Sequence, residues 1–215
     1  MNLVTLEIST LQHSVQVHKA PLCEVSPFFL KTLEGPFVEA QRAIVWLSDT
    51  TLATLTQFIE WLYSRTVSAE CADDVDCTGS TNKLLDIYIF VDRYQVRQLR
   101  IDTLKIYAKT CDKSNRFPSG AQVASLYDNL PENAPLLKYV VDLDAGCWMP
   151  APSVIDTLEK CWHPRLMMMI LHATCTKRDI NTESLTPYHS NPCAYHEHLS
   201  REEEENCPEK RRKTK

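Results

Sequence analysis

The chain has 215 residues, of which 44% are hydrophobic and 24% charged, and its formal net charge is −5. These shares are typical of globular proteins and exclude a wholly disordered chain. Phosphate contacts require a concentrated basic surface, so we predict no direct binding of nucleic acid.

Glycine is scarce, with only four in the chain, and no two of them lie close together in sequence. Loops that cradle phosphates need clustered glycines, because the backbone must approach the ligand closely. The sequence therefore lacks a Walker loop, a dinucleotide-binding fingerprint and a nucleophile elbow. We predict that the chain is not an enzyme and has no small-molecule substrate.

Nine cysteines are present, an odd number. Residues 1–20 lack the charged start and apolar run of a secretory signal. No uninterrupted apolar stretch approaches the roughly 20 residues that a membrane span needs. We therefore expect a nuclear or cytoplasmic location, no membrane contact and free thiols.

The first expected elements are two strands. Apolar residues alternate with polar ones over residues 4–8, and Val15 and Val17 continue the alternation after a polar turn. This pattern predicts a hairpin. Helical spacing then runs over residues 18–34, interrupted by a proline at position 27. We expect two short helices there, the second beginning with Pro27.

Residues 43–47 have the composition of a buried strand, and Ser48 and Asp49 could cap the helix that follows. The polar stretch 64–82 predicts a loop insertion, and residues 84–99 predict a strong helix. Further helical patches follow at 121–129, 135–143 and 152–173. Without regular βαβ alternation, this order predicts an α+β fold, a small mixed sheet flanked by a helical cluster.

Several short motifs occur in a fixed order along the chain. They are His18-Lys19 with Leu22, Ser26-Pro27-Phe28-Phe29, Phe58–Ser64, Tyr88–Tyr94 and Tyr127–Asn133. Together they resemble BTB/POZ domain proteins, of the type common in filamentous fungi, over roughly residues 3–145. The resemblance implies a BTB/POZ domain at 1–112, a C-terminal helical extension at 113–175, and a polar, disordered tail at 176–215.

The resemblance also implies a function in protein–protein interaction, through homodimers or heterodimers of BTB domains. Such domains typically dimerise through the first helices and strand, which here makes residues 11–33 the candidate interface. The candidates for interface residues, or for residues that support the interface, are Leu11, Val17, Leu22, Phe28 and Phe29. Ordinary core packing is the alternative for this apolar set.

Two other functions remain open, a substrate adaptor for a cullin-type ubiquitin ligase and a nuclear transcription-associated regulator. Cullin-binding members often carry an apolar-x-Glu motif just before the helix that here begins near Thr51. This chain has Thr51-Leu52-Ala53 at that place, without the glutamate, which weakens the adaptor hypothesis.

The end of the chain holds two further motifs. For the first motif a tail without fixed structure is the favoured interpretation, and it implies no cofactor; for the second, a solubilising tail stands on equal terms with its alternative. The alternative for the first motif is a zinc site, since zinc takes four thiolate or imidazole ligands; they would be Cys193, His196, His198 and Cys207. The alternative for the second is a nuclear-localisation signal formed by Lys210, Arg211, Arg212 and Lys213.

Overall fold

The computed structural model describes residues 2–8, 13–67, 78–114, 118–147, 163–176 and 187–210. The chain divides into two compact units, residues 1–110 and 111–215. Within the described residues no helix is both long and apolar enough to cross a bilayer. Each unit is treated below by itself.

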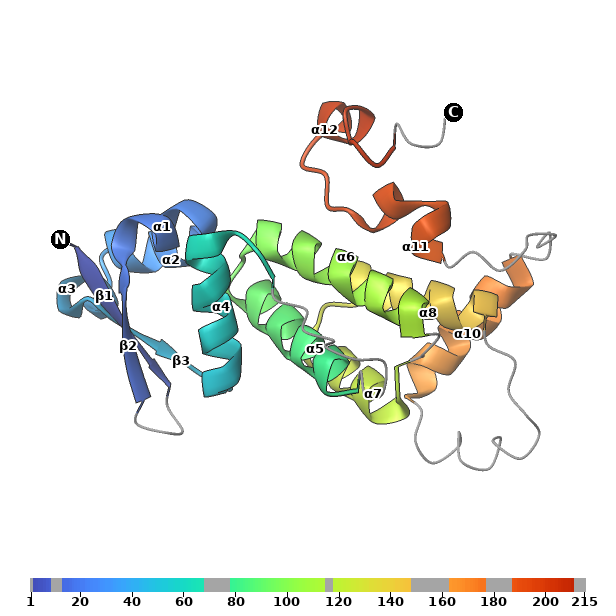
Figure 1. The fold of residues 1–215 in the computed structure, drawn as a ribbon, viewed down its shortest axis with the longest axis horizontal. Coiled ribbons are helices and arrows are strands. Elements are labelled where there is room, and N and C mark those ends of the chain that lie inside the picture. Colours follow the sequence, from blue (N-terminus) through green and yellow to red (C-terminus); the bar gives the residue numbers. More distant parts are fainter. Residues whose placement is uncertain are drawn as a thin grey trace. The chain divides into compact units, whose positions relative to one another are not determined.

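The N-terminal unit contains a mixed three-stranded sheet (Figure 1). The strands are β1 (Leu3–Ile8), β2 (His13–His18) and β3 (Ile44–Leu47), in the order β2-β1-β3. β1 pairs with β2 in antiparallel and with β3 in parallel orientation. Alternate residues of β1 are buried, as the sequence pattern predicts.

Six helices accompany this sheet. They are α1 (Lys19–Val25), α2 (Pro27–Glu34), α3 (Val38–Arg42), α4 (Leu52–Ser64), α5 (Thr78–Arg93) and α6 (Arg97–Ser114), which continues into the second unit. The predicted break between α1 and α2 is confirmed. The Ser26 hydroxyl caps α2 by accepting the Phe29 N–H at 3.1 Å, and Pro27 takes the first helical position.

Two local predictions for the N-terminal unit are wrong. Thr51 caps α4, with its hydroxyl 3.1 Å from the Thr54 nitrogen, because Asp49 adopts a left-handed turn conformation before the helix. The predicted loop 64–82 is too long at its C-terminal end, since α5 already begins at Thr78. The middle of this loop, residues 68–77, lies outside the described residues.

Aromatic side chains dominate the core of the N-terminal unit. The ring of Phe29 stacks on that of Tyr94 at 5.6 Å between centroids, and Phe58 and Phe90 pack beside them. Trp61 is fully buried and donates its indole N–H to the Asp102 carboxylate at 3.1 Å. This core fixes the positions of α1, α2, α4 and α5 around one face of the sheet.

The C-terminal unit is helical in its described part. Its elements after α6 are α7 (Gly120–Asn129), α8 (Pro135–Cys147), α10 (Pro164–Thr176), α11 (Pro187–Ser190), the 3-10 helix η2 (Pro192–Tyr195) and α12 (Arg201–Glu205). α8 packs on α10, and both α11 and η2 contact α8. The fold class is confirmed as α+β with a small mixed sheet.

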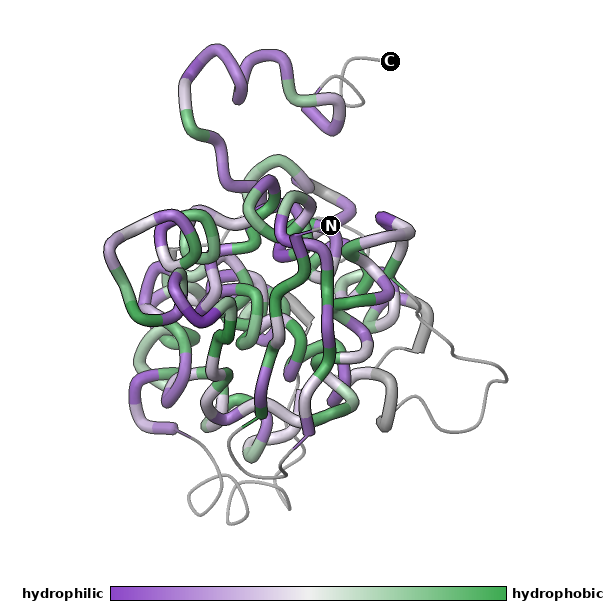
Figure 2. Tube along the Cα trace, turned by 90° about the vertical axis from the view of Figure 1, so that its left-hand side faces the viewer, coloured by the Kyte–Doolittle hydropathy of each residue, from purple (hydrophilic) through white to green (hydrophobic). Residues whose placement is uncertain are grey.

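The predicted disordered tail is wrong for residues 187–210, which carry three short helices. Tyr188 and Tyr195 are buried, and each packs edge-on against Tyr139 of α8. Figure 2 shows the last described segment before the C-terminus mostly in the hydrophilic colour. These two tyrosines dock the beginning of this polar segment on α8, which composition alone did not reveal.

Candidate functional site

The predicted interface residues are mostly core residues of the chain itself. Val17, Leu22 and Phe29 are 1%, 0% and 0% exposed, so they belong to the core, which agrees with the supporting role and the core packing given above. Phe28 is half-buried and packs its ring against Phe29 and Tyr94. Leu11 lies outside the described residues. The buried three instead support α1 and α2 from beneath.

A different set of apolar side chains lies exposed on α2 and α3. Leu30, Phe37 and Val38 are 42%, 42% and 55% exposed, and we call them the α2–α3 surface. The two helices contact each other through the turn at Gly35. A Cβ atom at Gly35 would lie 2.7 Å from the Phe37 ring, so only glycine lets this ring fold back over the turn.

Basic and acidic residues lie in equal numbers on the two helices that carry the α2–α3 surface. Lys31 and Glu34 are exposed on α2, and Glu39 and Arg42 lie on α3. Lys19 donates to the Leu33 carbonyl at 3.0 Å and lies 3.8 Å from Glu34. The rim therefore has both signs of charge around an apolar centre, as protein interfaces do.

The outer face of the sheet is less apolar. Trp46 on β3 is 60% exposed, and its cross-strand partner is Glu7. The same face presents Thr5 and Gln16, which pair with each other. This face also carries Leu3, which is 40% exposed, so its apolar side chains are spaced among polar ones. The α2–α3 surface has three exposed apolar residues on two contacting helices, and this pattern favours an interaction site.

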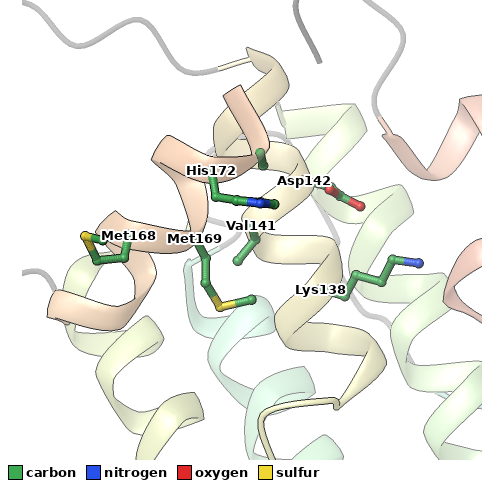
Figure 3. A pocket seen from close by; sticks show the side chains of 7 residues that line it. Lys138, Val141, Asp142, Met168, Met169 and His172 are labelled. Atoms are coloured by element: carbon green, nitrogen blue, oxygen red, sulfur yellow. The ribbon is translucent and has the colours of Figure 1, made fainter. Parts of the chain in front are cut away.

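A cavity of about 290 Å³ lies between α8 and α10 in the C-terminal unit. Figure 3 shows Lys138 and Asp142 extending from α8, and Met168, Met169 and His172 from α10. Lys138 donates to the Ala194 carbonyl at 3.1 Å, and the Tyr195 hydroxyl donates to Asp142 at 2.8 Å. These two charged groups thus hold η2 on α8.

Burial and the same hydrogen bond make the Tyr195 hydroxyl a weaker acid than a free tyrosine. Burial, followed by the bond to Asp142, raises the pKa of the Tyr195 hydroxyl well above its usual value. This tyrosine stays protonated and serves as a fixed donor. Lys138 and Asp142 at this cavity therefore have a structural use in the docking of η2.

Cys193, His196, His198 and Cys207 converge in the C-terminal unit. The Cys193 sulfur lies 3.2 Å from Nε2 of His198, and the Cys207 sulfur lies 3.3 Å from Nδ1 of His196. Both cysteines are buried, and both histidines are half-buried. Burial, reinforced by the neighbouring Cys207, raises the pKa of the Cys193 thiol.

The basic cluster is only partly described. Lys210 lies 3.1 Å from the Glu204 carboxylate, an ion pair at the surface. Arg211, Arg212 and Lys213 lie outside the described residues. The nuclear-localisation hypothesis therefore stays a prediction.

Sequence reasoning missed the α2–α3 surface and the tyrosines that dock the C-terminal segment. Tyr188 and Tyr195 could have been noticed as two large aromatic residues seven positions apart in an otherwise polar stretch. The exposure of Leu30 carries no such signal. It lies between two buried residues of α2, and helical spacing leaves open which of them faces the core.

Comparison with known proteins gives one clear result. The family model of the BTB/POZ domain matches residues 3–103, from the first residue of β1 into α6. This range lies within the N-terminal unit and includes the complete sheet. No curated protein matches the chain significantly.

Proposed function

The chain is a BTB/POZ domain protein, and we propose that this domain associates with a second BTB/POZ domain, in the first place another copy of itself, through the α2–α3 surface. The coarser function, a protein–protein interaction module, follows from the family. The proposal adds the surface and the partner.

The exposure of Leu30, Phe37 and Val38 is the observation that carries the proposal. Apolar side chains that remain exposed together on a folded domain mark interaction sites, because their burial releases ordered water. Leu30 also lies within residues 11–33, the interface that the family resemblance implies, and Phe37 and Val38 follow shortly after this range. Buried Phe29 and Leu33 hold α2 rigid beneath it, which limits the entropy lost on association.

The charge pattern favours a second copy as the partner. A two-fold interface brings the same patch of both chains together, so a patch of one charge sign would repel itself. Here two basic and two acidic residues surround the apolar centre, namely Lys31, Arg42, Glu34 and Glu39. Such a rim can pair opposite charges across the two-fold axis.

Light scattering of the full chain during gel filtration tests this proposal. We expect the mass of a dimer for the wild type and of a monomer for the double variant Leu30→Glu and Val38→Glu. The expected loss follows from placing carboxylates in a desolvated interface. Leu199→Glu is the matched control, since Leu199 is 81% exposed on the other unit.

A second control separates the α2–α3 surface from the exposed Trp46 on the sheet. Trp46→Glu should leave the dimer intact; loss of the dimer in this variant alone would place the interface on the sheet. A wild-type chain that stays monomeric at its highest soluble concentration would contradict self-association. Co-purification of a different BTB/POZ protein, lost in the double variant, would support the heteromeric form.

The cullin-adaptor and nuclear-regulator hypotheses remain separate. The described residues add no observation in favour of either. Pull-down of a cullin would establish the first, and a reporter confined to the nucleus by residues 208–215 would establish the second.

A further inference from the structure

Four potential metal ligands from two short elements meet in the C-terminal unit. Donor atoms of Cys193, His198 and Cys207 all lie within 4.8 Å of one another. His196 adds a fourth donor, with its Nδ1 3.3 Å from the Cys207 sulfur. The spacing Cys-x2-His-x-His-x8-Cys is thus closed into one cluster by the fold.

The distances match the edges of a tetrahedral zinc site. With Zn–S near 2.3 Å and Zn–N near 2.0 Å, adjacent ligand atoms are about 3.3–3.8 Å apart. The measured contacts are 3.2 Å from the Cys193 sulfur to His198 and 3.3 Å from the Cys207 sulfur to His196. The donor atoms of Cys193, His198 and Cys207 therefore lie where one metal ion could bind them, and the ring of His196 contacts this group through Cys207.

Short local structures position the four ligands. Cys193 lies in η2, and His196 directly follows it. Ser200 caps α12 by accepting the Glu203 N–H at 3.1 Å, and Cys207 occupies the turn after this helix. The Cys207 N–H donates to the Glu204 carbonyl at 3.2 Å, and its carbonyl accepts the Lys210 N–H at 3.0 Å.

The second nitrogen of His196 has a partner of the kind that ligand histidines need. Its Nε2 lies 3.4 Å from the hydroxyl of Tyr188. Tyr188 belongs to α11 and is buried against Tyr139 of α8. A histidine that binds metal through one nitrogen usually donates its other N–H to a nearby acceptor, which orients the ring. Tyr188 would thus link the cluster to the helical unit.

Apolar burial does not explain how the end of the segment keeps its fold. In residues 197–210 the buried residues are Cys207 and Glu209, and Leu199 is 81% exposed. α12 has only five residues, whereas isolated helices shorter than about 12 residues are marginal in water. Such small structures commonly depend on a metal or a disulfide.

We propose that Cys193, His196, His198 and Cys207 bind one Zn²⁺ ion, which fixes α12 to η2. Two thiolates and two imidazoles in tetrahedral arrangement select zinc, whereas calcium and magnesium require oxygen ligands. All four positions are filled by the protein, so the site is structural and has no open position for a substrate. This inference does not depend on the proposed function.

Metal analysis of the full chain is the first test. Wild-type protein purified under reducing conditions and passed through a desalting column should hold one zinc ion per chain. The double variant Cys193→Ser and Cys207→Ser should hold none. Cys175→Ser is the matched control and should keep its zinc, since Cys175 is an exposed thiol on α10.

Cobalt binding to the metal-free wild type is a second test that does not depend on how the variants fold. Added Co²⁺ should produce the visible bands of tetrahedral cobalt and a thiolate-to-cobalt charge-transfer band. His198→Asn should weaken zinc binding by more than the roughly 10–100-fold that loss of an outer-shell partner causes. His196→Asn should weaken zinc binding in the same way.

Two outcomes would overturn the proposal. One is a reduced chain that holds no zinc and shows no tetrahedral cobalt spectrum. The other is a disulfide between Cys193 and Cys207 in protein alkylated at lysis, which would show that the two sulfurs pair with each other. Faster amide exchange over residues 187–210 after addition of a chelator would support the structural role.

Discussion

The core of the N-terminal unit and the segment 187–210 are held together in opposite ways. In the core, Phe29, Phe58, Phe90 and Tyr94 are almost fully buried and pack ring against ring. The segment has short helices, a polar surface and a cluster of sulfur and nitrogen donors. Apolar burial is insensitive to pH and metals, whereas a ligand cluster depends on both. Removal of metal or a change of pH should therefore unfold the segment 187–210 while the core of the N-terminal unit stays folded.

The largest effect is expected from truncating the aromatic core. Phe29→Ala removes a fully buried ring that stacks on Tyr94 and Phe58, and leaves a cavity. We expect the free energy of unfolding of the N-terminal unit to fall by about 3–5 kcal/mol in urea titrations. Leu30→Ala in the same helix should cost under about 1 kcal/mol, because Leu30 is 42% exposed. Zinc content should be the same in both variants, and its loss in Phe29→Ala would contradict independent stabilisation of the two regions.

A second prediction concerns pH. Asp144 on α8 is 2% exposed, and its carboxylate oxygens have no hydrogen-bond partner among the described residues. Burial raises the pKa of this carboxyl from 3.8 to about 7. Between these values the folded chain keeps a proton that the unfolded chain releases. The stability of the C-terminal unit therefore falls as the pH rises from about 4 to about 7.

Asp144→Asn should remove this loss. At pH 8 the variant should exceed the wild type in free energy of unfolding by on the order of 3–4 kcal/mol, and at pH 4 the two should be similar. Urea titrations at several pH values measure the difference. The N-terminal unit should not respond to this substitution. An equal effect of the variant at both pH values would show that the carboxyl is not protonated in the folded chain.

The smallest expected effect compares two serine caps. Ser26 is fully buried; its hydroxyl accepts the Phe29 N–H and donates to the Tyr94 carbonyl at 2.6 Å. Ser26→Ala should cost about 2–3 kcal/mol, because it leaves both groups buried without a partner. Ser200→Ala at α12 should cost about 0.5–1 kcal/mol, since water can reach the freed N–H. Denaturation reports the first and amide exchange the second; equal costs would contradict the assumed difference in burial.

The sheet and most helices could be predicted because their signals are local. Alternation in β1 and the proline after Ser26 each act within a few residues. The cap at Thr51 was missed because Asp49 enters a left-handed turn, and the Arg93 side chain binds both its carboxylate and the Ser48 carbonyl. That contact comes from a helix 44 residues further along the chain, so no window of sequence contains it.

For a related reason, the sequence could not predict which apolar residues of the first helices are exposed. Sequence identifies Leu22, Phe28, Phe29 and Leu30 as apolar but not which of them the core covers. The structure buries Leu22 and Phe29, half-buries Phe28 and exposes Leu30. Periodicity defines a stripe on a helix, whereas the packing of neighbouring elements decides how much of the stripe is covered.

By itself the sequence determined the resemblance to the BTB/POZ domain, the α+β class, the break between α1 and α2 and the positions of four cysteine and histidine residues of the type that binds metals. Residue type and short-range spacing are sufficient for each of these. Only the tertiary structure decided that Leu30, Phe37 and Val38 are the exposed apolar residues and that Cys193 and Cys207 meet. Both facts depend on contacts between segments that the chain must first bring together, and the free energy of those contacts is not encoded in any one of the segments.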